Sequence, residues 1–335
     1  MNWTPPTQSQ YRETTISVRE NHLLLVKHAA AIGSDADESS LLLATVGTGQ
    51  ANVYDCNYCN EGVIDLVSQL PLVCPTSNDP IQGTAVHWIN TAFDLLLVVG
   101  DASGTVRVSS FTKTRELVRF SANQQDPITY LDSRTTKGDY PVDILVCSAT
   151  SVASLWRVNG NMNVKKVLEV NAACACLLRD GCRIVYTNET DVNVLDVGEG
   201  IEPLEDKTPT IAFQSGHSGA IECICALSDD TVICRSANGY ISILSLSLKS
   251  TLASFQTEKS PSPTFELNAS KKLMCTVSKK PSSVSIYNVE TGRLVQSLKV
   301  RQGMTIAYCF FAKGYLFSVG DNGLVVRLWI EIDEK

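Results

Sequence analysis

One pattern of apolar and polar positions recurs along the chain. A short apolar run is followed by a turn rich in Gly, Ser, Asn or Asp, and then by a run in which apolar and polar residues alternate. Alternation with a period of two is typical of a β-strand with one buried face, so each copy predicts a pair of antiparallel strands. Seven copies can be recognised, at residues 41–55, 95–110, 143–158, 182–197, 230–246, 272–289 and 315–330.

The spacing of these copies indicates one repeated unit. Alignment of their second strands places seven residues at one position: Tyr54, Ser109, Trp156, Leu195, Leu244, Tyr287 and Trp329. The intervals between them range from 39 to 55 residues, and the longest contains an insert at 72–83. Four strands in roughly 40–45 residues is the period of a propeller blade, and further strand-like runs lie between the copies. Helical periodicity is absent over any stretch of about 11 residues, so we predict an all-β protein.

The two ends of the chain fit one another. The last repeat contains three predicted strands, at 305–311, 315–320 and 324–332, and lacks a fourth. The strand-like run TTISVRE, at 14–20, belongs to no other repeat. Since an open sheet edge exposes unpaired backbone groups, we predict that this N-terminal strand completes the last blade. Residues 1–13 are then a flexible tail, and residues 14–335 are one propeller with blades at about 22–71, 84–121, 127–170, 172–214, 218–256, 264–300 and 304–332.

Several segments resemble the WD40-repeat β-propeller family. GDASGTVRV (100–108), VSIYNVETGRLVQSLK (284–299) and GDNGLVVRLW (320–329) resemble the family's paired strands, and Gly216-His217 resembles its Gly-His dipeptide. Tyr54-Asp55 and Leu195-Asp196 stand where the family usually has Trp-Asp, whereas Leu244-Ser245 departs from it. The resemblance covers about residues 14–332 and implies a divergent, seven-bladed WD40-like β-propeller that binds other proteins.

Composition and charge narrow the range of functions. The chain has 335 residues, 44% of them hydrophobic, with a formal net charge of -7. This composition is globular, and the acidic balance does not support contact with nucleic acid. No apolar run approaches the ~18–20 residues of a membrane helix, and no secretory signal is recognisable at the N-terminus. We therefore expect no membrane insertion and a cytoplasmic or nuclear location.

The sequence contains few residues arranged for catalysis or metal binding. Its four histidines are His22, His28, His87 and His217, and the family resemblance implies a structural, turn-fixing role for His217. Cys56 and Cys59 form the only CxxC pair; an ordinary loop is favoured over a zinc site because no second ligand pair follows. Most of the 12 cysteines lie in strand-like runs, as expected of small buried hydrophobic residues.

Neither a nucleophile elbow nor a phosphate-binding loop is present. We therefore predict no catalytic, cofactor-binding or metal residues, no cofactor and no enzyme. A propeller hydrolase or lyase would need a cluster of His, Asp and Glu around the central channel.

A binding surface remains as the source of function. Within the family, the turn in each repeated phrase and the loop that enters the next blade lie at the same end of the ring. On this mapping, six basic residues form one sector: Arg235, His217, Lys259, Lys279, Lys280 and Arg301. The opposite side carries Asp101, Glu189 and Asp191. The basic sector could receive an acidic or phosphorylated peptide segment, or its charges could be scattered solubilising residues.

We predict a non-catalytic protein-interaction scaffold that is a subunit of a larger complex. The alternative is a reader of acidic or phosphorylated segments. Ser260 and Ser262, each followed by Pro, are candidate phosphorylation sites beside the basic sector.

Overall fold

The repeated phrases fold into a series of antiparallel sheets in the computed structural model of the chain. The structure describes residues 10–14, 26–32, 41–61, 63–92, 94–135, 142–198, 208–260, 264–268, 272–278, 283–299, 305–312, 315–320 and 326–332. Within these residues, 28 strands form seven four-stranded sheets, which we call blades 1 to 7.

The first three blades follow the order of the chain. Blade 1 contains β2 (His28–Ile32), β3 (Leu42–Val46), β4 (Gln50–Asp55) and β5 (Asp65–Pro71), with a 3-10 turn, η1 (Cys59–Glu61), before β5. Blade 2 contains β6 (Gly83–Asn90), β7 (Leu95–Asp101), β8 (Thr105–Ser110) and β9 (Arg115–Ser121). Blade 3 contains β10 (Ile128–Thr135), β11 (Val142–Ser148), β12 (Val152–Val158) and β13 (Val164–Asn171).

The next three blades continue in the same order. Blade 4 contains β14 (Cys174–Leu177), β15 (Arg183–Asn188), β16 (Asp191–Asp196) and β17 (Ile211–Gln214). Blade 5 contains β18 (Ile221–Ala226), β19 (Thr231–Ser236), β20 (Tyr240–Ser245) and β21 (Ser250–Gln256). Blade 6 contains β22 (Glu266–Asn268), β23 (Leu273–Val277), β24 (Ser283–Asn288) and β25 (Leu294–Lys299).

Blade 7 joins the two ends of the chain. Its strands are β26 (Ile306–Ala312), β27 (Tyr315–Gly320), β28 (Val326–Ile332) and β1 (Gln10–Thr14). β1 runs antiparallel to β28, with Gln10 opposite Ile332 and Thr14 opposite Leu328. The prediction that residues 14–20 form the closing strand is therefore wrong in position, because the strand that pairs with β28 lies earlier in the chain. Residues 10–13, predicted to be a flexible tail, belong to this strand. Strands pair through backbone groups, which every residue has, so the β-branched residues of 14–20 did not identify the segment that pairs. Residues 15–20 lie outside the described part of the chain.

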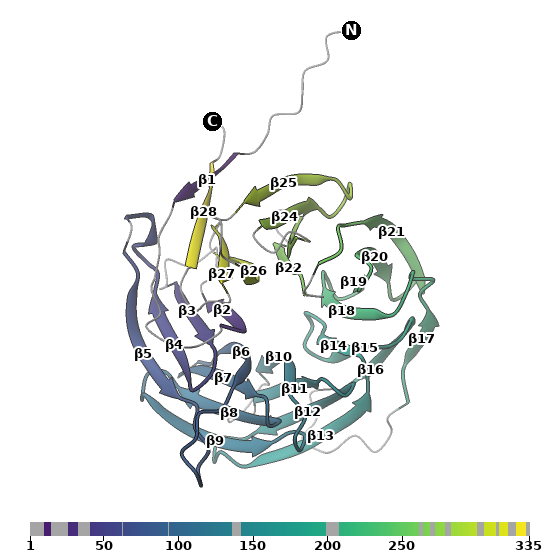
Figure 1. Ribbon diagram of the computed structural model, residues 1–335. Coiled ribbons are helices and arrows are strands. Elements are labelled where there is room, and N and C mark those ends of the chain that lie inside the picture. The colour runs from purple at the N-terminus through teal and green to yellow at the C-terminus, as the bar shows by residue number, and fades with distance from the viewer. Residues whose placement is uncertain are drawn as a thin grey trace.

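The blades stand side by side around a centre (Figure 1). The first strand of each blade, such as β2, β6 or β10, lies innermost, and the fourth strand, such as β5, β9 or β13, lies on the outer rim. The prediction of an all-β propeller is confirmed. The third and fourth repeats, at 143–158 and 182–197, belong to four-stranded sheets like the others.

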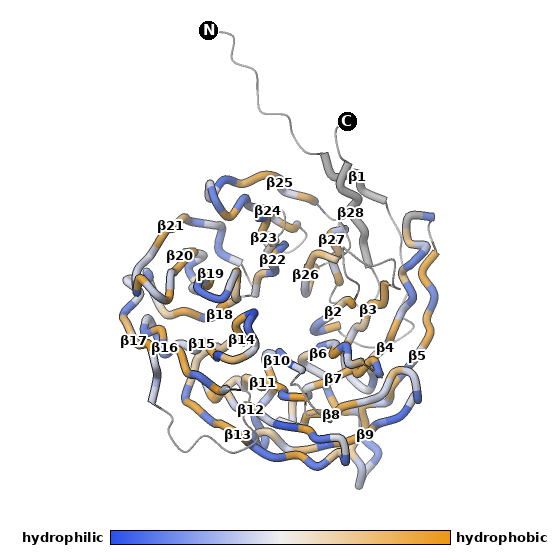
Figure 2. Tube along the Cα trace, turned by 180° about the vertical axis from the view of Figure 1, so that it is seen from behind, coloured by the Kyte–Doolittle hydropathy of each residue, from blue (hydrophilic) through white to orange (hydrophobic). Residues whose placement is uncertain are grey.

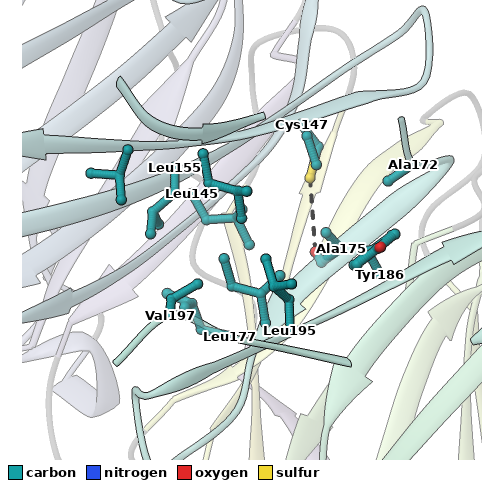
Figure 3. Close-up of a cluster of buried hydrophobic side chains, with 13 residues drawn as sticks. Leu145, Cys147, Leu155, Ala172, Ala175, Leu177, Tyr186, Leu195 and Val197 are labelled. Atoms are coloured by element: carbon teal, nitrogen blue, oxygen red, sulfur yellow. Dashed lines mark hydrogen bonds between the residues drawn. The ribbon is translucent and has the colours of Figure 1, made fainter. Parts of the chain in front are cut away.

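The hydrophobic core is divided among the interfaces between blades. Each of the seven clusters found in the described residues joins two neighbouring blades, including blades 7 and 1. Between blades 3 and 4, for example, Leu145 and Leu155 pack with Leu177 and Leu195 (Figure 3). Hydropathy varies along the strands (Figure 2), and the inner strands are buried on both faces, since every residue of β3 and of β11 is buried. Burial at these interfaces holds the ring together.

A β-bulge recurs at the same place in five blades. The register between the third and outermost strands shifts so that one residue of the outer strand is extra. The extra residues are all Val or Leu: Val67, Leu117, Val167, Leu252 and Val295. A bulge re-aims neighbouring side chains and increases the local twist, so this feature shapes the outer rim in the same way from blade to blade.

Candidate functional site

Polar side chains from five blades line one cavity near the centre of the ring. The cavity has a volume of about 210 Å³ and is lined by residues of β2, β6, β10, β22 and β26. Its polar or aromatic walls include His28, His87, Tyr130, Glu266 and Tyr308. These residues are far apart in the sequence, and they meet because each lies on the innermost strand of its blade (Figure 1).

Burial shifts the pKa values of the ionisable groups in this cavity. Burial, together with the nearby carboxylate of Asp132, raises the pKa of Glu266 to about 7. The Tyr308 hydroxyl donates a hydrogen bond to the Glu266 carboxylate. Burial and then the charge of His87 lower the pKa of His28 to about 4. His28 is therefore neutral at pH 7, and its Nδ1 accepts a hydrogen bond from the backbone N–H of Val86 at 3.4 Å.

A second polar pair continues this network into blade 3. Burial raises the pKa of Asp132, whose carboxylate accepts a hydrogen bond from the backbone N–H of Leu177 at 3.0 Å. Burial also lowers the pKa of His87, and its Nε2 lies 2.9 Å from the Ser133 hydroxyl. These polar groups bond to one another across neighbouring blades, so the arrangement fixes the inner wall of the ring.

A larger cavity of about 510 Å³ lies beside the innermost strands of blades 3, 4 and 5. Arg134, in its wall, donates to the buried Asp143 carboxylate at 2.7 Å and also to the carbonyl of Gly181. Arg157 donates to the other oxygen of Asp143 at 2.6 Å. Two guanidinium groups thus compensate one fully buried carboxylate. The ion network links blade 3 to the turn that follows β14.

Two residues of the predicted basic sector are inside the protein. The Arg235 side chain is 1% exposed, and its Nη1 donates to the Thr264 carbonyl at 3.0 Å and to the Thr276 hydroxyl at 2.9 Å. The prediction that Arg235 lies on the surface is therefore wrong. Arg235 lies on β19, a middle strand of blade 5, and its guanidinium group donates hydrogen bonds to residues of blade 6. Asp101, from the predicted acidic side, is also buried and accepts hydrogen bonds from Ser103 and Thr105.

His217 is likewise buried. Its Nδ1 lies 2.6 Å from the Ser242 hydroxyl on β20, and burial lowers its pKa to about 4. The contact ties the entry loop of blade 5 to its third strand, in keeping with the turn-fixing role that the family resemblance implies. Lys259 is exposed, whereas Lys279, Lys280 and Arg301 lie outside the described residues. The described members of the set therefore do not form a shared surface.

The outer rim carries a surface that the sequence reasoning missed. In blade 1, four large apolar side chains in the stretch 58–67 are exposed: Tyr58 (61%), Val63 (45%), Leu66 (49%) and Val67 (47%). We call these four residues the blade 1 patch. The sequence contains one signal for this surface: the consecutive apolar residues at 66 and 67 interrupt the alternation of apolar and polar residues in β5.

Metal sites and membrane-spanning helices are absent from the part of the chain that the structure describes. The described residues contain no group of three or more His, Cys, Asp or Glu side chains placed to hold a metal ion. They also contain no helix of the length and hydropathy needed to span a membrane. The two thiols of the CxxC pair are buried and are not joined in a disulfide, and burial raises the pKa of Cys56 to about 12.

Comparison with known proteins supports the fold. No family model matches the chain, and no curated protein matches its sequence. A chain in the crystal structure of a mitotic checkpoint complex superposes with a TM-score of 0.70 at 10% identity, covering 99% of this chain and 96% of that one. The WD40 β-propeller domain of Doa1 superposes with a TM-score of 0.69 at 13% identity, covering 97% and 98%. The chain therefore has the fold of a WD40 β-propeller.

Proposed function

We propose that this protein is a non-catalytic interaction scaffold and a subunit of a larger protein complex. The observation that supports this most directly is the distribution of exposed apolar side chains. Every large apolar side chain that is exposed among the described residues lies on an outermost strand or in the segment leading to it: Tyr58, Val63, Leu66, Val67, Leu248, Leu252 and Leu294.

Clustered apolar side chains at a surface favour contact with another molecule. Burying one Leu or Val side chain contributes roughly 1.5–3 kcal/mol, and neighbouring apolar residues add their contributions in one interface. The ring supplies a rigid frame, since its blades are joined by apolar clusters on both sides. A rigid frame lowers the entropy lost on binding. One structural neighbour belongs to a multiprotein assembly, so this fold is compatible with such a role.

The proposal is tested by purifying the full chain with an affinity tag from its native cells at endogenous expression levels. We expect one or more proteins to be recovered at a fixed ratio to the chain, and native mass spectrometry to show an assembly larger than the monomer. Recovery of the chain alone, as a monomer, under several salt conditions would contradict the proposed function.

A further inference from the structure

Two of the four residues of the blade 1 patch, Leu66 and Val67, lie at the β-bulge between β4 and β5. Val53 lies opposite Ser68 and Tyr54 lies opposite Leu66, so Val67 is the extra residue of β5. In a regular strand, neighbouring side chains point to opposite faces. The bulge disturbs this alternation, and Leu66 and Val67 are both about half exposed.

The patch lies on an outer edge of the ring. β5 is the last strand of its sheet, and its outer edge pairs with no other strand among the described residues (Figure 1). Tyr58 and Val63 extend the apolar surface from the strand into the segment that precedes it. A partner segment can therefore contact side chains and, along the same edge, backbone groups.

The charged residues of the segment that carries the patch have one sign. Residues 55–71 include Asp55, Glu61 and Asp65 but no Lys or Arg. Glu61 and Asp65 are exposed, and no ion pair of either carboxylate is found in the described part of the chain. The edge of the patch thus offers two free negative charges beside about half-exposed apolar side chains.

The corresponding surface of blade 5 differs in charge. Leu252 is the bulge residue of β21 and is 53% exposed, and Leu248 is exposed nearby. The charged residue between them is Lys249. The Asp230 carboxylate also lies here and accepts a hydrogen bond from the backbone N–H of Ser247 at 2.8 Å. The apolar surface of blade 5 thus has charges of both signs, so we expect it to select different partners from the blade 1 patch.

We propose that the blade 1 patch binds a protein segment in which apolar side chains are flanked by Lys or Arg. The apolar residues of the segment cover Leu66, Val67, Tyr58 and Val63, and its cations pair with Glu61 and Asp65. This inference rests on the proposed scaffold function and names the chemistry of one partner. A protein segment is favoured over a membrane because Glu61 and Asp65 would be repelled by anionic lipid headgroups.

The test uses two fluorescent ten-residue peptides, one alternating Leu and Lys and one alternating Leu and Glu, with the purified full chain. We expect the Lys peptide to bind measurably more tightly than the Glu peptide, with an affinity that falls as salt rises. The double variant Leu66→Ser/Val67→Ser and the double variant Glu61→Lys/Asp65→Lys should each weaken binding of the Lys peptide at least tenfold. Leu252→Ser, at the matched bulge of blade 5, should bind it like the wild type.

Circular dichroism melting curves check that each variant is folded, which is expected because all five substituted side chains are exposed. Equal binding of the Lys peptide to wild type and both double variants would overturn the proposal, as would tighter binding of the Glu peptide. Vesicles of phosphatidylcholine and phosphatidylserine provide the alternative partner; sedimentation with them that depends on Leu66 and Val67 would also overturn it. If native partners are recovered but the double variants retain all of them, this inference fails while the scaffold function stands.

Discussion

At the scale of single residues, burial decides which polar groups are available for binding. Arg and Asp are usually exposed, so a sequence reading places them on the surface by default. Arg235 and Asp101 depart from this rule because each bonds to protein groups that would otherwise be unpaired. The partners of Arg235 lie in blade 6, so the sequence around Arg235 carries no information about them, whereas Asp101 bonds to the turn that directly follows it.

Arg235 is expected to stabilise the protein rather than to bind a partner. Arg235→Met keeps an apolar stem but removes the donor to the Thr264 carbonyl and the Thr276 hydroxyl. We expect the free energy of unfolding to fall by about 1–3 kcal/mol in chemical denaturation. Lys259→Met, at an exposed position, is the control and should change it by less than about 0.5 kcal/mol. An Arg235→Met protein of unchanged stability that loses a partner would contradict this role.

Glu266 is expected to make stability depend on pH. Its folded pKa of about 7 is above the ordinary value of 4.5, so the folded protein binds this proton more tightly than the unfolded chain does. The resulting stabilisation is fully present below pH 4.5 and is lost as pH rises through 7. His28 acts in the opposite direction, because its lowered pKa costs stability as pH falls from 6.5 towards 4.

Glu266→Gln isolates the contribution of the carboxyl group. The unfolding free energy of the variant, minus that of the wild type, should rise between pH 5 and pH 8 by about 1–3 kcal/mol. Urea denaturation at several pH values measures this difference, with the histidine contribution cancelling to first order. A difference that is constant with pH, or that falls, would show that Glu266 ionises normally in the folded protein.

At the scale of elements, strands that bury one or both faces could be predicted, and irregular features could not. Alternating apolar residues located the strands because burial against the next blade requires them. The bulge residues, such as Val67 and Leu252, are ordinary strand formers, so the local sequence does not specify which residue is extra, although the apolar pair at 66 and 67 interrupts the alternation of β5. β1 was placed too late in the chain because backbone pairing with β28 does not depend on β-branched side chains.

Pairing of β1 with β28 is expected to stabilise the ring. Deletion of residues 1–14 removes β1 and leaves the outer edge of β28 without its partner strand. We expect a lower melting temperature and concentration-dependent aggregation, measured by calorimetry and light scattering. Deletion of residues 1–9 keeps β1 and serves as the matched control. Indistinguishable behaviour of the two truncated proteins would show that this pairing contributes nothing to stability.

At the scale of the whole molecule, the period of the repeats was sufficient to predict a propeller. The proposed binding surface could be recognised only from the three-dimensional structure. Which side chains share a cavity or a patch depends on the closure of the ring, as with Glu266 and His28 on blades 6 and 1. The blade 1 patch also depends on exposure, because the apolar pair Leu66 and Val67 interrupts the alternation of β5 but does not by itself show that both side chains are exposed. The side chains on the surface of the ring, rather than the fold itself, therefore determine what the protein can bind.

Zero-length carbodiimide cross-linking of the purified native complex tests the central claim most directly, because it joins a carboxylate only to an amine in contact with it. The account predicts that Glu61 and Asp65 become linked to lysines of a partner protein, and that Leu66→Ser/Val67→Ser removes these links. Cross-links to partners that arise only from carboxylates far from the blade 1 patch, such as Glu189 and Asp191, would contradict it.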